Sequence, residues 1–177
     1  KLYGVSQQKN WSPFFVDGRL VCLYSHRPMT LIAKGRDKWE PVFKGVPVEW
    51  DYGEIRGGAP PVRIGDEWYE VFHSAVETKA SNGKRSKVYY AGMLTFSDKF
   101  KPLRITRNPI MAADKDMYTE PWGPGSNVAA VFPCGALHDE TGWAISYGYL
   151  DSEQRIARFA DEAIENALEP ICGDMKS

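Results

Sequence analysis

The sequence contains few cysteines, and nothing in their arrangement ties them to a metal or to one another. Cys22, Cys134 and Cys172 lack metal-ligand spacing, and an odd, sparse count argues against a disulfide framework. This usage favours a reducing compartment, so we expect a cytoplasmic protein. Because histidines are also scattered along the chain, we expect no metal site.

The sequence also lacks an excess of charge of either sign, and it lacks long apolar runs. A net charge of −1 is not the excess of positive charge that is typical of proteins that bind nucleic acid or an anionic membrane. No apolar run approaches the ~18 residues that a membrane-spanning helix needs. Glycine-rich nucleotide motifs and a Gly-x-Ser-x-Gly elbow are absent. We therefore expect no cofactor, no serine nucleophile, and neither nucleic acid nor membrane as a partner.

Hydrophobic and aromatic residues, in contrast, are well represented. The chain has 177 residues, of which 43% are hydrophobic and 13% aromatic. This length and composition suit a single domain over residues 1–177 with a sizeable core. Abundant aromatic rings are typical of β-rich folds and also of sugar-binding surfaces, and composition alone does not separate the two.

One pattern occurs three times: a strand, a tight acidic turn, an aromatic-rich strand, a polar loop and a further strand. Its turns are Asp17-Gly18, Gly65-Asp66 and residues 139–142, and Asp-Gly is a strong hairpin signal. In the second copy we expect a polar loop over residues 75–87. The strands expected in the three copies are residues 14–16, 19–25 and 29–33; 61–64, 67–74 and 88–96; and 128–137, 143–148 and 154–159.

This uneven repeat predicts an all-β fold. Short antiparallel strands in units of roughly 40 to 50 residues indicate propeller blades, here about three of them. A β-sandwich is the structural alternative, because it also has short strands and frequent turns. One short helix is expected at residues 161–169, with acidic residues in its first turn and Pro170 beyond its end. Residues 173–177 are expected to form a tail.

The segment from Asp51 to Val62 carries the most suggestive chemistry. Two carboxylates and Arg56 precede a Gly-Gly pair, and two prolines then stiffen the entry to a strand. An arginine presented in this way suits a phosphate or carboxylate, because its planar fork donates two parallel hydrogen bonds. The plainer interpretation is a surface ion pair among Asp51, Glu54 and Arg56.

Seven short motifs follow one another along the chain. They are residues 9–14 (Lys-Asn-Trp-Ser-Pro-Phe), 57–62 (Gly-Gly-Ala-Pro-Pro-Val), 68–73 (Trp68 to Phe72-His73), 90–94 (Tyr-Ala-Gly-Met-Leu), 107–111 (Arg-Asn-Pro-Ile-Met), 127–135 (Asn-Val to Pro-Cys-Gly) and 147–151 (Tyr-Gly-Tyr-Leu-Asp). Together, in this order, they resemble glycoside hydrolase family 130, the β-mannoside phosphorylases and related hydrolases built as five-bladed β-propellers. The resemblance extends from Lys9 to about Phe159.

The resemblance implies an inverting phosphorolysis of a small β-mannoside, in which inorganic phosphate is the co-substrate and mannose 1-phosphate is a product. Such a reaction needs a carboxylic acid that protonates the leaving oxygen, and cations that gather phosphate. The positions that match phosphate-binding segments are Lys9, Arg56 and His73. The positions that match the sugar-binding wall are Asn10, Tyr90, Phe132 and Asp151. His26 and His138 have no such support and are expected to be structural.

The sequence also departs from the family pattern. A full member is roughly twice this length, and its amino-terminal half carries the general acid in a motif that is missing here. The chain begins at Lys1 and not at Met, so an upstream piece is expected. Without it, the ring would be closed by a homo-oligomer or by a second chain. If water replaces phosphate as the attacking group, a carboxylate base is required, for which Glu54 and Asp51 are candidates. The alternative is a non-catalytic carbohydrate-binding propeller remnant.

Overall fold

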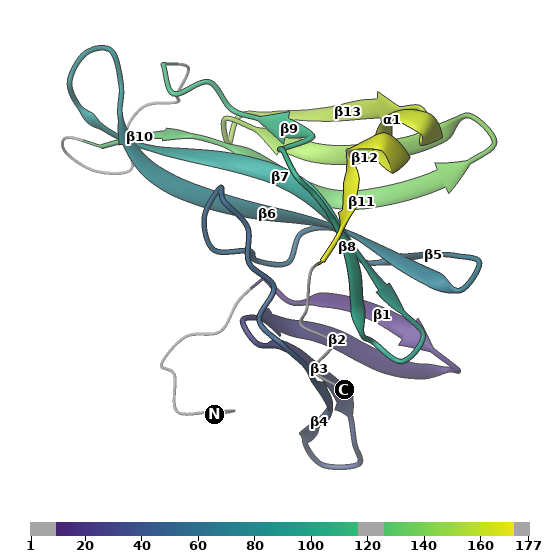
Figure 1. Cartoon of the computed structure of the whole chain (residues 1–177). Coiled ribbons are helices and arrows are strands. Elements are labelled where there is room, and N and C mark those ends of the chain that lie inside the picture. Colours follow the sequence, from purple (N-terminus) through teal and green to yellow (C-terminus); the bar gives the residue numbers. More distant parts are fainter. Residues whose placement is uncertain (1–9, 117–125, 172–177) are drawn as a thin grey trace.

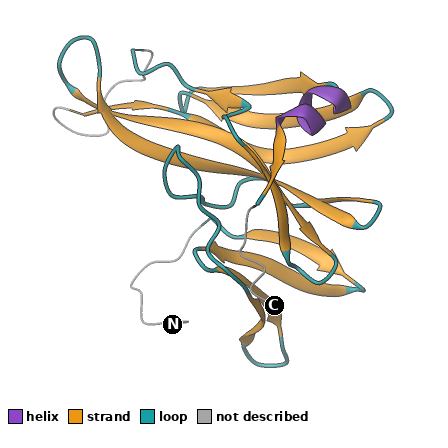
Figure 2. Cartoon of the chain, in the orientation of Figure 1, coloured by secondary structure: helices purple, strands orange, loops and turns teal. Residues whose placement is uncertain are grey.

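The chain folds almost entirely into β-strands, with a single short helix (Figure 2). The structure is a computed structural model that describes residues 10–116 and 126–171. Its strands form three separate sheets that follow one another in chain order, except that the last strand returns to the second sheet (Figure 1). We call them the first, second and third sheet. No helix in the described ranges is long and apolar enough to cross a membrane.

The first sheet is an antiparallel meander of four strands. Its turn between the first two strands is the predicted Asp17-Gly18, and both residues have the positive φ angles, 49° and 75°, that a tight two-residue hairpin turn requires. The predicted first hairpin is therefore confirmed. The fourth strand was not predicted. The strands are β1 (Ser12–Val16), β2 (Arg19–His26), β3 (Met29–Lys34) and β4 (Trp39–Lys44).

The second sheet is the largest and is dominated by one long hairpin. Its strands β6 (Glu67–Lys79) and β7 (Arg85–Ser97) pair without interruption from Glu67 opposite Ser97 to Lys79 opposite Arg85. The polar loop expected over residues 75–87 is therefore wrong, because only residues 80–84 form the turn. The other strands are β5 (Val62–Ile64), β8 (Pro102–Thr106), β9 (Met111–Ala112), β10 (Ser126–Ala129) and β14 (Leu168–Pro170).

The third sheet is followed in the chain by the helix and by one strand of the second sheet. Its strands are β11 (Val131–Asp139), β12 (Gly142–Tyr149) and β13 (Glu153–Phe159), all antiparallel. Helix α1 (Asp161–Ala167) is two residues shorter than the predicted 161–169. The chain leaves the helix at Leu168 because β14 there pairs with β8 of the second sheet. The predicted tail at residues 173–177 lies outside the described residues.

The second sheet lies between the other two, and each of its faces carries a separate core. Side chains of a strand alternate between faces, so neighbouring residues point to opposite cores. Phe72 and Leu94 pack with Leu31 of the first sheet. Val71 and Met93 pack with Trp143 and other residues of the third sheet. Three successive sheets stacked face to face are the arrangement of consecutive propeller blades, whereas a sandwich has two sheets.

A buried polar network joins the first two sheets. Glu70 of β6 is fully buried and accepts a hydrogen bond from the Ser12 hydroxyl at 2.8 Å. Its other carboxylate oxygen lies 2.7 Å from Nε2 of His26, which is also buried. Satisfying Glu70 in this way fixes the first sheet against the second, since a buried carboxylate without partners is costly. His26 thus has a structural position, as the sequence predicted.

Candidate active site at the meeting of three inner segments

Three segments, which we call the inner segments, come close together at the site. They are Asn10 just before β1, residues 56–58 between the first and second sheets, and Pro133 of β11. Arg56 pairs with His73 through two backbone hydrogen bonds of 2.8 and 3.0 Å, so it lies on the inner edge of the second sheet. A Cβ on Gly57 would lie 2.3 Å from the backbone oxygen of Asn10, and one on Gly58 would lie 2.8 Å from Cγ of Pro133. The two glycines therefore let the three segments approach one another closely.

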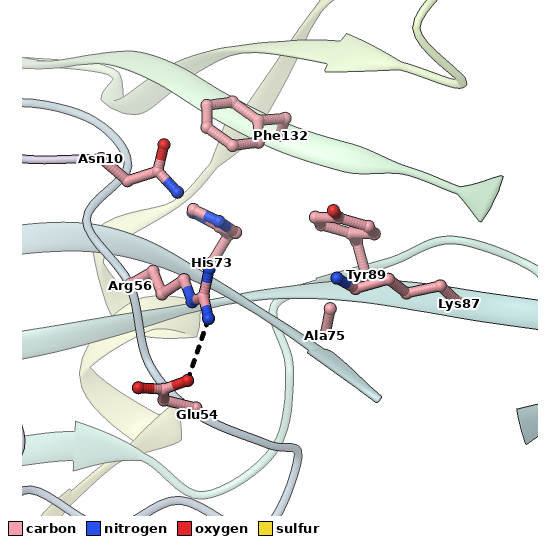
Figure 3. Close-up of a pocket in the computed structure, with 8 residues that line it drawn as sticks. All are labelled: Asn10, Glu54, Arg56, His73, Ala75, Lys87, Tyr89 and Phe132. Carbon is pink, nitrogen blue, oxygen red and sulfur yellow. Dashed lines mark hydrogen bonds and ion pairs between the residues drawn. The ribbon is translucent and has the colours of Figure 1, made fainter. Parts of the chain in front are cut away.

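A cavity of about 130 Å³ opens beside this meeting point (Figure 3). Its walls come from Asn10 just before the first sheet, from the segment that joins the first sheet to the second, and from strands of the second and third sheets. Four of the residues predicted for phosphate or sugar binding are among them. The lining residues are Asn10, Glu54, Arg56, His73, Ala75, Lys87, Tyr89 and Phe132.

Arg56 offers a partly exposed guanidinium to this cavity. Its side chain is 46% exposed, and its Nη2 donates to Oε2 of Glu54 at 3.0 Å (Figure 3). The surface ion pair of the plainer interpretation therefore exists, but it lies in the cavity wall and not apart from it. Within the described residues, Asp51 does not join this pair. A guanidinium with one carboxylate contact keeps other N–H donors for a further oxyanion.

His73 contributes a neutral ring and not a cation. It is 2% exposed, lies beneath the Tyr89 ring and contacts Phe132, with ring centroids 5.9 and 4.4 Å away. The pKa of His73 is lowered to about 4, mainly because the ring is buried and in part because of the positive charge of Arg56. Its Nδ1 is buried without a hydrogen-bond partner. His73 can therefore exchange a hydrogen bond with a ligand near neutral pH, but it adds no charge.

The other predicted site residues lie in different places. Tyr90 points to the opposite face of β7, where its ring packs against Tyr52 at 5.3 Å, and it does not line the cavity. Asp151 is exposed in the turn between β12 and β13 with φ of 53°, and it is likewise not a lining residue. Asp51 lines a neighbouring hollow of about 320 Å³, to which Glu54 also contributes. Lys9 lies outside the described residues.

Two lining residues were missed by the sequence reasoning. Tyr89 and Lys87 fall on one face of β7, directly opposite Ala75 and Glu77 of β6. The Nζ of Lys87 lies 5.5 Å from the centre of the Tyr89 ring, within the range of a cation–π contact. Assigning residues 75–87 to a loop hid both residues. An alternating pattern counted backwards from residue 96 would have placed Tyr89 and Lys87 on the His73 face.

Comparison with known proteins gives this site a context. The family model described as beta-1,4-mannooligosaccharide phosphorylase matches residues 5–169. A 1,2-beta-oligomannan phosphorylase from Thermoanaerobacter sp. is 27% identical over 79% of this chain and 46% of its own length. A beta-1,2-mannobiose phosphorylase from Listeria innocua is 29% identical over 60% of this chain and 27% of its own length.

The fold has a counterpart among solved structures. The structure of the Listeria innocua beta-1,2-mannobiose phosphorylase in complex with beta-1,2-mannobiose matches 92% of this chain and 47% of that one, with a TM-score of 0.60 and 18% identity. The chain thus spans about half the length of the first relative and of this solved structure. Since the family model covers almost the whole chain, this protein belongs to glycoside hydrolase family 130.

Proposed function

We propose that the chain forms part of an enzyme that cleaves a β-mannosidic bond with phosphate as the acceptor. The observation that carries the proposal is that Arg56, His73, Asn10 and Phe132 meet in one cavity, although they come from distant parts of the sequence. The names of the relatives support the same reaction class. The inorganic phosphate is a substrate here, and no other cofactor is proposed.

The proposed reaction is a single inverting displacement. A phosphate oxygen forms a bond to the anomeric carbon as the glycosidic C–O bond breaks, and a general acid protonates the leaving oxygen. The Arg56 fork binds two phosphate oxygens, and His73 orients a third through a neutral hydrogen bond. Phe132 offers an apolar face to the sugar ring. Among the described lining residues, Glu54 is the one carboxyl group, and it binds Arg56. We therefore infer that the general acid is supplied from outside this chain.

The direct test is an activity assay on the full chain, alone and together with a second polypeptide that supplies the general acid. The substrates are β-1,2- and β-1,4-mannobiose, with and without inorganic phosphate, and the products measured are mannose 1-phosphate and free mannose. We expect mannose 1-phosphate only when phosphate is present and only when the general acid is supplied. Equal release of free mannose in both conditions would contradict phosphorolysis.

Hydrolysis is the second candidate, and the position of Glu54 favours it. Glu54 lies in the cavity wall beside Arg56, where a carboxylate could activate water in place of phosphate. Asp51 is a weaker candidate because it faces the neighbouring hollow. A Glu54→Gln variant separates the two reactions. It should abolish phosphate-independent release if Glu54 is the base, and it should spare or improve phosphate use if Glu54 only competes for Arg56.

A non-catalytic carbohydrate-binding module is the remaining alternative. Such a module would retain the aromatic wall and Asp151 but would lack the general acid. It would bind β-mannobiose without turnover, and an Asp151→Ala variant would lose that binding. Phosphate-dependent turnover in this assay together with unchanged sugar binding in Asp151→Ala would exclude this alternative.

A further inference from the structure

Lys87 is a cation in the cavity wall that neither the motifs nor the resemblance assign. It lies on β7 two residues before Tyr89, on the face that carries His73 of the neighbouring strand. In Figure 3 its amino group lies beside the Tyr89 ring, on the side of Arg56 and His73. The inference below rests on the proposed phosphate site and extends it.

The local ion pairs leave Lys87 without a direct ionic partner among the described residues. Glu77 lies directly opposite Lys87 in the β6–β7 ladder and would be the expected partner for it. Glu77 instead forms its ion pair with Arg85, which is the main cause of its lowered pKa, and the charge of Lys87 adds to that lowering from a longer distance. The direct contact of the Lys87 ammonium is with the Tyr89 ring.

The contact with Tyr89 also fixes where this charge lies. A lysine side chain has many rotamers, and an aromatic face within about 6 Å of the ammonium favours those that keep it there. The same Tyr89 ring is stacked on His73, with 16° between the two ring planes. Lys87, Tyr89 and His73 therefore form a continuous wall that ends beside Arg56, which pairs with His73 (Figure 3).

The charge balance of the cavity shows why this lysine is important. Its ionisable lining residues are Arg56, Glu54 and Lys87, besides His73, which is neutral near neutral pH, and Tyr89. Arg56 and Glu54 form a pair and cancel, which leaves the positive charge of Lys87. We propose that Lys87 is a specificity-determining residue that makes this cavity bind an anion, by contacting the acceptor phosphate opposite Arg56.

The test is the affinity of the full chain for inorganic phosphate, measured by isothermal titration calorimetry at low and at physiological salt. Lys87→Met removes the charge but keeps a long apolar side chain on Tyr89. Lys84→Met is the matched control, because Lys84 lies on the same hairpin, is exposed and does not line the cavity. We expect Lys87→Met to weaken phosphate binding roughly tenfold and to reduce its salt dependence, as loss of a direct charge contact does.

The outcomes separate this inference from the proposed function. Lys84→Met should change the dissociation constant less than about twofold, as a distant exposed charge does. If Lys87→Met binds phosphate like the parent while Arg56→Met does not, the role of Lys87 is refuted and the phosphate site at Arg56 stands. If the parent chain binds no phosphate, both proposals are refuted. Equal melting temperatures of the variants would show that the fold is unaffected.

Discussion

Arg56 and His73 show how far single residues could be interpreted from sequence. The motif order and the Gly-Gly context singled out both, and the structure joins them by two backbone hydrogen bonds. The charge state of His73 was not accessible, because it depends on burial under Tyr89 and Phe132. Tyr90 and Tyr89 illustrate the same limit, since adjacent strand residues face opposite sides and the motif does not say which side holds the cavity.

The first prediction at the scale of a residue concerns the planar guanidinium group of Arg56. Arg56→Lys keeps the positive charge but loses bidentate geometry, so the KM for phosphate should rise roughly tenfold. Arg63→Lys is the control, because Arg63 is an exposed arginine paired with Asp98 and does not line the cavity. Steady-state kinetics at varied phosphate, with the general acid supplied, measures both. An unchanged phosphate KM in Arg56→Lys would rule out the two-point contact.

The lowered pKa of His73 predicts a pH-dependent stability. In the unfolded chain a histidine takes up a proton near its ordinary value of 6.5, whereas His73 in the folded chain does so only near pH 4. Protonation therefore favours unfolding between these values, and stability falls as pH drops from about 6.5 to 4.

Protonation linked to His73 should lower the free energy of unfolding at pH 4.5 by about 2 to 3 kcal/mol relative to neutral pH. Urea unfolding at pH 7.0, 5.5 and 4.5 measures it, with His73→Asn as the comparison. The variant should lose less stability on acidification than the parent. Parallel pH profiles for the two proteins would show that His73 titrates normally.

At the scale of elements, the sequence succeeded where the turn chemistry was strong. Asp17-Gly18 and Gly65-Asp66 marked two hairpins that the structure contains. Short or edge strands such as β4, β9 and β14 were missed, because two to six residues carry too little alternation to recognise. The outer part of the β6–β7 hairpin was mistaken for a loop because both of its faces are largely polar beyond the core.

The close approach of the three inner segments yields a prediction about elements. Gly57→Ala would place a Cβ 2.3 Å from the Asn10 backbone oxygen and 2.4 Å from Oγ of Ser12. Backbone must move to accept it, so we expect a loss of about 2 to 3 kcal/mol in unfolding free energy. Gly148→Ala is the control, since no atom lies within 4 Å of its added Cβ.

Chemical denaturation measures both glycine variants. Gly148→Ala should be neutral or slightly stabilising, because alanine has less conformational freedom to lose in a strand. A Gly57→Ala protein as stable as the parent would show that the segments carrying Arg56 and Asn10 are not held against each other as described.

At the scale of the whole molecule, the three sheets form a stack whose two outer faces carry exposed apolar residues (Figure 1). Phe15 of the first sheet is 67% exposed, and Leu137 and Ile156 of the third are 59% and 69% exposed. Phe15 follows the buried Phe14, and Leu137 and Ile156 pair with Ala144 and Ser146 of β12, which alternate with the buried Trp143 and Ile145. All three exposed side chains therefore lie on faces turned away from the second sheet. We propose that further sheets, from a second copy or another chain, cover these faces and close the ring.

This proposal predicts association in solution. Light scattering should give a mass above the 20.0 kDa of one chain, and Ile156→Asp should reduce it. Val46→Asp is the control, because Val46 is also an exposed apolar residue but follows β4 outside the sheets. A monodisperse monomer at high protein concentration, unchanged by either substitution, would contradict ring closure by another copy.

The central claim is that inner segments of three sheets build one phosphosugar site, and chemical-shift mapping with mannose 1-phosphate tests it most directly. We predict saturable shifts of the ring signals of His73 and Phe132, whereas the Tyr52–Tyr90 pair on the opposite face of the second sheet stays unchanged. Saturable shifts confined to Tyr52 and Tyr90, or none at any ligand concentration, would contradict the site described here.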